Sequence, residues 1–218
     1  MSDKNMLVFD LGYNMGNFTK QILSLYPDAK IIGIDGHPDY QKFFNANPIP
    51  NVTYLHGLIS NQCTDGIPFY ICDSNPGINS INPNWIKTIR HSHFFEKTKR
   101  TVMEKSITID RLIELYGIPD ILKMDIEGSE AIALQGLTQK CGLVIFEWSE
   151  EFFYGATECV KRLKELGYNL FSYTEESDQF NPDLPFLSWE NLKLFENIVP
   201  ERMQRWGMIY TKSEMKEK

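Results

Sequence analysis

The chain has 218 residues, of which 42% are hydrophobic and 23% are charged, and its formal net charge is −7. This length fits a single domain, taken here as residues 1–218, and the composition is that of a globular protein, which excludes a disordered chain and a fibrous repeat. The acidic charge argues against nucleic acid as a partner, because phosphate binding needs a positive surface.

The sequence shows no sign of a targeting segment or a membrane span. The first apolar run, at residues 6–10, is five residues long and has no basic head before it, unlike a signal peptide. No apolar run approaches the roughly 18–20 residues that a membrane span needs. The four cysteines form no C-x-x-C pair, which favours reduced thiols and argues against a structural zinc. We therefore expect a cytoplasmic protein without a membrane partner, and the sequence leaves its oligomeric state open.

Seven short apolar runs predict the strands of a mostly parallel sheet, because they lack the alternation of strands that face water on one side. They span residues 6–11, 30–35, 52–59, 121–126, 143–148, 169–173 and 207–211. Helical patterns lie between several of them, at residues 17–25, 110–116, 130–137 and 157–166. This alternation of strand and helix predicts a doubly wound α/β fold.

Two segments interrupt this rhythm. Possible strands at residues 67–72 and 106–109 would form a small hairpin that flanks a basic insertion at about 73–105. Within it, residues 87–105 carry six basic side chains against two acidic ones, which fits either a solvated helix face or a lid over an anionic substrate. The second segment, about 175–200, carries aromatic residues that favour a small satellite core and offer one ring for a sugar to stack on.

A glycine turn follows the first strand and opens the first helix, in the sequence Asp10-Leu11-Gly12-Tyr13-Asn14-Met15-Gly16. In such a turn Gly12 allows a tight bend, and Gly16 lets the helix approach the sheet. Asn14 stands where a dinucleotide motif needs its second glycine, so a pyrophosphate is disfavoured. Asp10 suits a ligand with an ammonium group, such as S-adenosylmethionine, although it could instead cap the helix.

Asp35 ends the second strand, 25 residues after Asp10, where an acid can accept hydrogen bonds from both ribose hydroxyls. Alone it would be read as a turn former, but together with the glycine turn it favours a donor site. The expected donor-binding residues are Asp10, Gly12, Tyr13, Asn14, Gly16, Phe18, Asp35, Gly36, Leu58 and Asp125.

The segment from Asp125 to Glu130 follows the fourth strand of the expected sheet, at the end where ligands bind. Asp125 and Glu127 would share one strand face and point at one pocket. Asp125 is our first candidate for orienting an acceptor hydroxyl and taking its proton, the alternative being that it only orders the donor. Glu127 is a second catalytic candidate. His93 is a third, because a neutral imidazole is well matched to proton transfer at pH 7.

Glu147 and Trp148 end the next strand and are candidates for binding the substrate, together with Arg90 and His91 of the basic insertion. Asp125, Glu127 and Glu147 could also hold a hard divalent cation that lowers the pKa of a hydroxyl. Glu130 is expected to begin the next helix, where its negative charge interacts favourably with the positive end of the helix dipole.

These motifs together resemble the FkbM family of methyltransferases. Residues 8–16 resemble its glycine motif, and residues 108–113 followed by 121–130 resemble its second signature. The resemblance covers about residues 6–148. It implies a Rossmann-like seven-stranded sheet with an antiparallel last strand, S-adenosylmethionine as the methyl donor, and an acceptor oxygen on a carbohydrate, glycan or small metabolite. The chain departs from the family at Tyr13, where Ala is common, and at Asp35-Gly36, where Glu-Pro is common.

Two other functions remain open. A methyltransferase that acts on RNA could use residues 87–105 to hold phosphates, although the overall acidic charge counts against it. A non-catalytic module could keep the donor pocket as a sensor. A nicotinamide-dependent dehydrogenase is disfavoured by Asn14.

Overall fold

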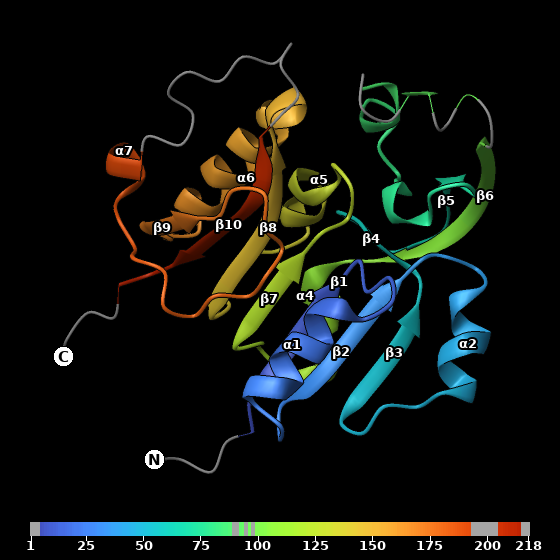
Figure 1. Ribbon diagram of the computed structural model, residues 1–218, viewed down its shortest axis with the longest axis horizontal. Coiled ribbons are helices and arrows are strands. Elements are labelled where there is room, and N and C mark those ends of the chain that lie inside the picture. Colours follow the sequence, from blue (N-terminus) through green and yellow to red (C-terminus); the bar gives the residue numbers. More distant parts are fainter. Residues whose placement is uncertain (1–4, 89–91, 94–95, 97–98, 193–204, 215–218) are drawn as a thin grey trace.

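A seven-stranded sheet forms the centre of the computed structural model, which describes residues 5–88, 92–93, 96, 99–192 and 205–214. Its strands are β1 (Leu7–Leu11), β2 (Lys30–Asp35), β3 (Val52–His56), β7 (Ile121–Met124), β8 (Leu143–Ser149), β9 (Leu170–Tyr173) and β10 (Trp206–Lys212). They lie in the order β3-β2-β1-β7-β8-β10-β9 (Figure 1). The first five pair in parallel, whereas β10 is antiparallel to both β8 and β9. The expected Rossmann-like sheet with an antiparallel last strand is confirmed.

Helices cover both faces of this sheet. They are α1 (Asn17–Leu25), α2 (Tyr40–Ala46), α4 (Ile109–Tyr116), α5 (Glu130–Gln135), α6 (Phe153–Glu165) and α7 (Trp189–Leu192). Buried side chains of α4, α5 and α6 form one core cluster with the sheet. Those of α1 form a second core cluster on the other face, joined by aromatic residues of the segment 180–186. The two apolar faces explain the near-continuous apolar strands, and the fold is doubly wound as expected.

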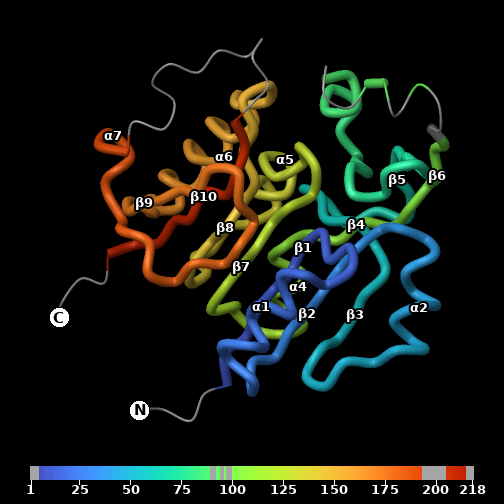
Figure 2. Tube along the Cα trace, viewed as in Figure 1, coloured from blue at the N-terminus to red at the C-terminus, as the bar shows by residue number. Residues whose placement is uncertain are grey.

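A small second sheet contains β4 (Leu58–Ile59), β5 (Thr64–Cys72) and β6 (Lys99–Ile107), in the order β4-β6-β5. The antiparallel pair β5 and β6 is the expected hairpin. It lies on the side toward which β1, β2 and β3 point (Figures 1 and 2). The short strand β4 was expected to continue β3, but Gly57, with φ 154°, separates the two.

Several boundaries differ from the sequence-based expectation. Strand β6 begins at Lys99, inside the expected basic insertion, and ends before Ile109, because the Thr108 hydroxyl accepts a hydrogen bond from the Arg111 amide and starts α4. Helix α6 begins at Phe153 instead of residue 157. The earlier start was missed in the sequence because Gly155, in the first turn, is a poor helix former. Helix α2 was not expected. Among the described residues, none of the helices has the length and apolarity to cross a membrane.

Replacement of Phe146 tests the core of this sheet. Phe146 is 0% exposed at the centre of β8, so Phe146→Ala should lower the free energy of unfolding by about 3–5 kcal/mol in urea denaturation. Tyr154 on α6 is 67% exposed, and Tyr154→Ala should stay within about 0.5 kcal/mol of the unchanged protein. Similar losses for both variants would contradict this assignment of the core.

Candidate functional site

A cavity of about 610 Å³, open to solvent, lies at the carboxyl ends of β1, β2 and β7. It lies where open α/β sheets bind their ligands. Six of the residues expected to bind the donor line it: Gly12, Asn14, Asp35, Gly36, Leu58 and Asp125. A second cavity shares three of these residues and extends toward α1 and β10, where Tyr13 and Phe18 line it. The two cavities therefore adjoin across the glycine turn.

The glycine turn is packed tightly against the end of β7. Gly12 has φ 78°, and a Cβ atom there would lie 1.8 Å from the Asp125 carbonyl oxygen. The amides of Gly12 and Tyr13 both donate to the Ile34 carbonyl oxygen, each at 3.0 Å. Only glycine fits this close approach, as the sequence motif predicted.

Asp35 ties the glycine turn to the end of β2. One carboxylate oxygen accepts a hydrogen bond from the Asn14 amide at 2.8 Å, and the other accepts one from the His37 amide at 2.8 Å. Burial raises the pKa of Asp35, and these two amides oppose the rise. Each carboxylate oxygen can accept a further hydrogen bond, so the geometry is compatible with the expected pair of ribose hydroxyls.

Lys123, which sequence reasoning did not single out, occupies the centre of the site. Its ammonium nitrogen lies 3.3 Å from Asp10 Oδ1 and 3.5 Å from Asp125 Oδ2, and it donates to the Gly12 carbonyl oxygen at 3.2 Å. Burial lowers the pKa of Lys123, but the charges of Asp10 and Asp125 outweigh burial and hold this pKa above its ordinary value. The only signal in the sequence is a lysine inside an otherwise apolar strand.

Asp10 is therefore the counter-ion of a buried lysine. Its side chain is 0% exposed, and its second oxygen accepts a hydrogen bond from the Thr19 hydroxyl at 2.8 Å. Asp10 lines neither cavity, and Gly16 lines neither. The expected contact of Asp10 with an ammonium group is thus made within the protein, by Lys123.

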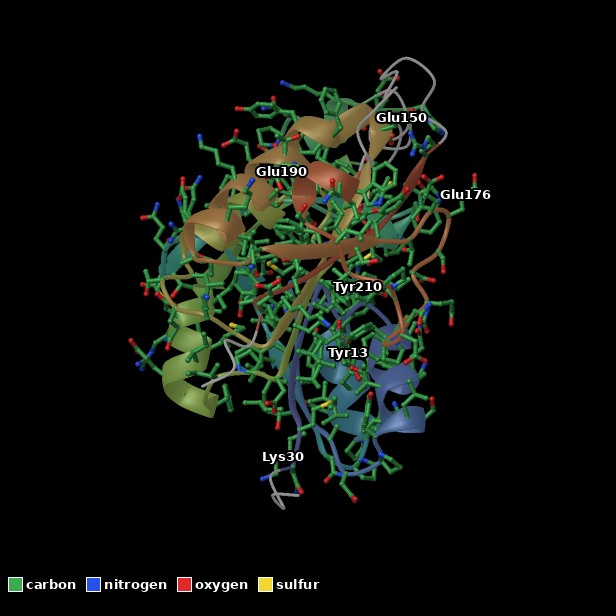
Figure 3. The ribbon with its side chains drawn as sticks, turned by 90° about the vertical axis from the view of Figure 1, so that its left-hand side faces the viewer. Tyr13, Lys30, Glu150, Glu176, Glu190 and Tyr210 are labelled. Atoms are coloured by element: carbon green, nitrogen blue, oxygen red, sulfur yellow. The ribbon has the colours of Figure 1, made fainter. Side chains whose placement is uncertain are left out.

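Tyr13, the departure from the family pattern, lies in the interior (Figure 3). Its ring is 2% exposed and packs edge-to-face against Phe44 and Tyr54, with centroids 5.0 and 5.6 Å away. A Cβ atom on Gly33 would lie 2.1 Å from this ring. The tyrosine fills the space above a bare stretch of β2.

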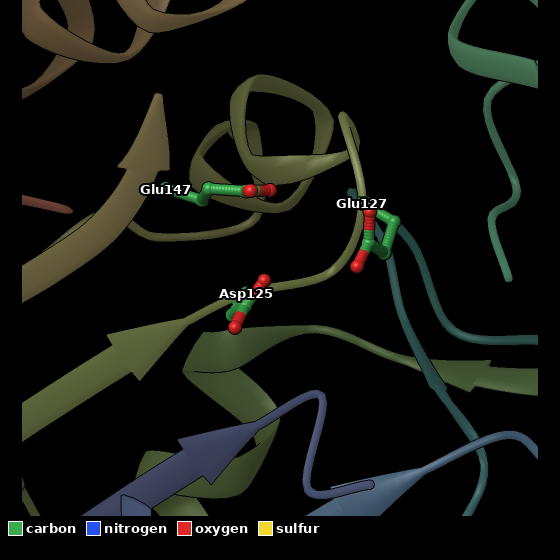
Figure 4. Close-up of side chains that lie close together, drawn as sticks. All are labelled: Asp125, Glu127 and Glu147. Atoms are coloured by element: carbon green, nitrogen blue, oxygen red, sulfur yellow. The ribbon is translucent and has the colours of Figure 1, made fainter. Parts of the chain in front are cut away.

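Three carboxylates converge beside the first cavity (Figure 4). One oxygen from each of Asp125, Glu127 and Glu147 lies within 4.8 Å of the others, and all three side chains are half-buried. The expectation that Asp125 and Glu127 share a strand face is wrong, because β7 ends at Met124 and Glu127 adopts a left-handed conformation with φ 56°. Such a group of oxygens can bind substrate hydroxyls or hold a hard cation.

Burial and mutual repulsion change the acidity of this loop. Burial, then the charges of Glu147 and Asp125, raise the pKa of Glu127 well above its ordinary range. Burial raises the pKa of Glu130 to about 7, although its carboxylate accepts a hydrogen bond from the Ile126 amide at 2.8 Å. Glu130 begins α5, as expected.

The comparisons with known proteins agree with this geometry. A model of the methyltransferase FkbM domain matches residues 12–170. The chain belongs to this family. The protein named "Methyltransferase 1" of Beauveria bassiana (strain ARSEF 2860) is 27% identical over 148 residues, which are 60% of this chain and 57% of that protein. The match thus spans little more than half of this relative.

Solved structures of low sequence identity were also found. Precorrin-6y C5,15-methyltransferase from Geobacter metallireducens GS-15 is 11% identical with a TM-score of 0.49, over 96% of this chain and 80% of that one. Aeropyrum pernix fibrillarin in complex with natively bound S-adenosyl-L-methionine is 12% identical with a TM-score of 0.45, over 95% and 66%. The family and the sheet topology confirm the expected family and fold class.

Two of the remaining candidates of this FkbM-family chain, Trp148 and His93, line neither cavity. Trp148 is 2% exposed in the core, because successive residues of β8 point to opposite faces and Glu147 takes the side of the carboxylates. The assignment of Trp148 to the substrate is corrected accordingly. His93 is exposed and lines neither cavity. Arg90 and His91 lie outside the described residues.

The insertions contribute residues that the sequence did not indicate. Asn79 and Ile81, from the expected basic insertion, line the first cavity, and Asp178, from the second segment, lines the other. Their segments lack motifs, so only the folded chain brings them to the site. The aromatic residues Phe180 and Phe186 pack against the core cluster beside α1, and Trp189 packs against the cluster on the other face, so they extend the main core instead of forming a separate satellite core.

Replacement of Glu130 tests the acidity of the loop. Folded Glu130 keeps its proton up to a pKa of about 7, whereas the unfolded chain releases it near 4.5, so the folded state loses stability as pH rises between these values. Glu130→Gln retains the acceptor for the Ile126 amide and removes this loss. Between pH 4.5 and 8 its free energy of unfolding should gain about 3 kcal/mol relative to the unchanged protein.

Urea denaturation at both pH values measures this difference. Glu114 is 61% exposed, so Glu114→Gln is the matched control and should follow the unchanged protein. The same pH dependence for Glu130→Gln and the unchanged protein would contradict the raised pKa.

Proposed function

We propose that this chain is an S-adenosylmethionine-dependent O-methyltransferase, organised as a single domain, which methylates a hydroxyl of a carbohydrate, glycan or small metabolite. The observation that carries the proposal is the proximity of the cavity at the glycine turn to a group of acidic side chains. Asp125 and Glu127 line the same cavity as Asp35 and the glycine turn. One site thus offers both donor-binding groups and groups that can receive an acceptor's proton.

The first cavity has the chemistry of an adenosine site. Asp35 would hold the ribose hydroxyls, while Leu58 and Phe69, both nearly buried, give an apolar wall for the adenine. A Cβ atom on Gly36 would lie 2.3 Å from the Leu58 side chain, so the glycine keeps this wall in place. In the second cavity, Asp125 and Asp178 offer negative charge to the donor's amino group.

S-adenosylmethionine, when bound, supplies a methyl group made reactive by a positively charged sulfur. We propose Glu127 as the proton acceptor, because it lines the donor cavity beside Asp125, and burial raises its pKa, which makes its carboxylate a stronger base than an ordinary one. Asp125, held by Lys123, would orient the hydroxyl. Glu127 thus replaces Asp125, the first candidate from the sequence, as the proposed proton acceptor. Fixed positions of these groups can supply much of the rate.

The basic insertion gives little support to an RNA substrate. Arg100 lies 2.8 Å from an oxygen of Asp73 and 3.9 Å from one of Asp39, and Lys105 lies 3.7 Å from one of Asp65. These described basic residues have acidic neighbours that compete with phosphates. The carboxylates at the cavity favour an enzyme over a non-catalytic module.

Donor binding tests the proposal directly. The chain should bind S-adenosylhomocysteine in titration calorimetry, and Asp35→Ala should weaken binding by about 10-fold or more, the usual loss for a hydrogen bond to a charged group. Asp28→Ala, on an exposed turn, is the control. No binding at about 1 mM ligand would refute the proposal. Binding without transfer from labelled donor to a glycan and metabolite panel would support the module instead.

The three converging carboxylates also allow a test for a divalent cation, which would lower the pKa of a bound hydroxyl. If Asp125, Glu127 and Glu147 hold Mg²⁺, the ion should raise Tm by about 2–4 °C, and Glu147→Gln should abolish the rise. Glu165→Gln on α6 is the control. An equal rise in Glu147→Gln, or none in the unchanged protein, would exclude this cation site.

A further inference from the structure

Alternate residues of one stretch of the insertion, residues 79–82, face the cavity and the loop at residues 125–129 that follows β7. Asn79 and Ile81 line the donor cavity. Ser80 and Asn82 instead bond to the loop that follows β7. The stretch is anchored on β5, because Ser80 and Tyr70 exchange both backbone hydrogen bonds, at 2.9 and 3.1 Å. It therefore has a fixed position from which to hold the loop.

Two side chains of this stretch donate to the backbone of the loop. The Ser80 hydroxyl donates to the Glu127 carbonyl oxygen at 2.6 Å, and the Asn82 side-chain amide donates to the Gly128 carbonyl oxygen at 2.6 Å. Both donors are oriented by backbone amides: Ser80 Oγ accepts from the Asn82 amide, and Asn82 Oδ1 accepts from the Asn84 amide, each at 2.9 Å. Ser80 and Asn82 are 1% and 9% exposed.

The loop needs such support, because two effects push Glu127 out of place. Its left-handed backbone, φ 56°, costs a residue with a side chain about 1 kcal/mol or more. Its carboxylate also lies close to those of Asp125 and Glu147, and like charges repel. The next residue, Gly128, has φ 76° and lies under the Trp85 ring, where a Cβ atom would come within 2.7 Å.

We infer that Ser80 and Asn82 are positioning residues, which hold Glu127 in the conformation that directs its carboxylate to the acceptor. This inference rests on the proposed function, in which Glu127 receives the acceptor's proton. The inserted stretch is thus a working part of the active site, since it walls the donor cavity with one set of side chains and fixes the loop with the other.

Three variants and a rescue test this inference. Ser80→Ala removes the hydrogen bonds to the Glu127 carbonyl and the Ser129 hydroxyl, and Asn82→Ala removes the one to the Gly128 carbonyl. Ser80→Thr restores a hydroxyl, and Asn84→Ala is the matched control, because only its backbone amide takes part. Amide hydrogen exchange of residues 126–130 should become about 10-fold faster in both alanine variants. With an acceptor from the panel, kcat should fall about 10- to 100-fold while donor affinity is retained.

The outcomes separate this inference from the proposed function. Unchanged loop exchange in Ser80→Ala and Asn82→Ala overturns the inference, and so does a lower Tm without any loss of kcat. Recovery of kcat in Ser80→Thr, with Asn84→Ala unchanged, supports it. Absence of donor binding by the unchanged protein would refute the proposed function alone, since loop exchange would still report whether these residues hold Glu127.

Discussion

The buried ammonium group of Lys123 is the interaction on which this site depends. It joins the end of β1, through Asp10 and the Gly12 carbonyl, to the end of β7, through Asp125. These are the two strands between which the chain changes direction in the sheet, and a crevice opens there. A buried charge is tolerated only where it is paired, so the glycine turn and the acidic loop hold their positions together.

The same ion pairs set the charge available to ligands. Lys123 partly neutralises Asp125 and pairs with Asp10, while the carboxyl groups of Glu127 and Glu147 lie close to that of Asp125 beside the cavity. Three carboxyl groups therefore lie together where a cationic donor and an acceptor hydroxyl would meet. Asp35 and Glu130 keep their places through backbone amides, which are fixed by the fold.

Local patterns in the sequence predicted much of the fold. They also predicted those parts of the site whose residues belong to one short motif. Helix α1 and strand β2 have the bounds expected from periodicity, and Gly12 and Asp35 stand in a motif of fixed spacing. The convergence of Asp125 and Glu127 was anticipated for the wrong reason, because a left-handed residue directs it. Lys123 and Asn82 were missed, since their partners are distant in the chain and only tertiary packing brings them together.

Tyr13 and Gly33 share one volume inside the molecule. The ring occupies the space that any side chain at position 33 would need. Alanine at position 13 would leave this space free, and a larger residue at position 33 could then fill it. The tyrosine in the glycine turn and the glycine in the strand beneath it thus fit together, and a side chain at position 33 would require a smaller residue at position 13.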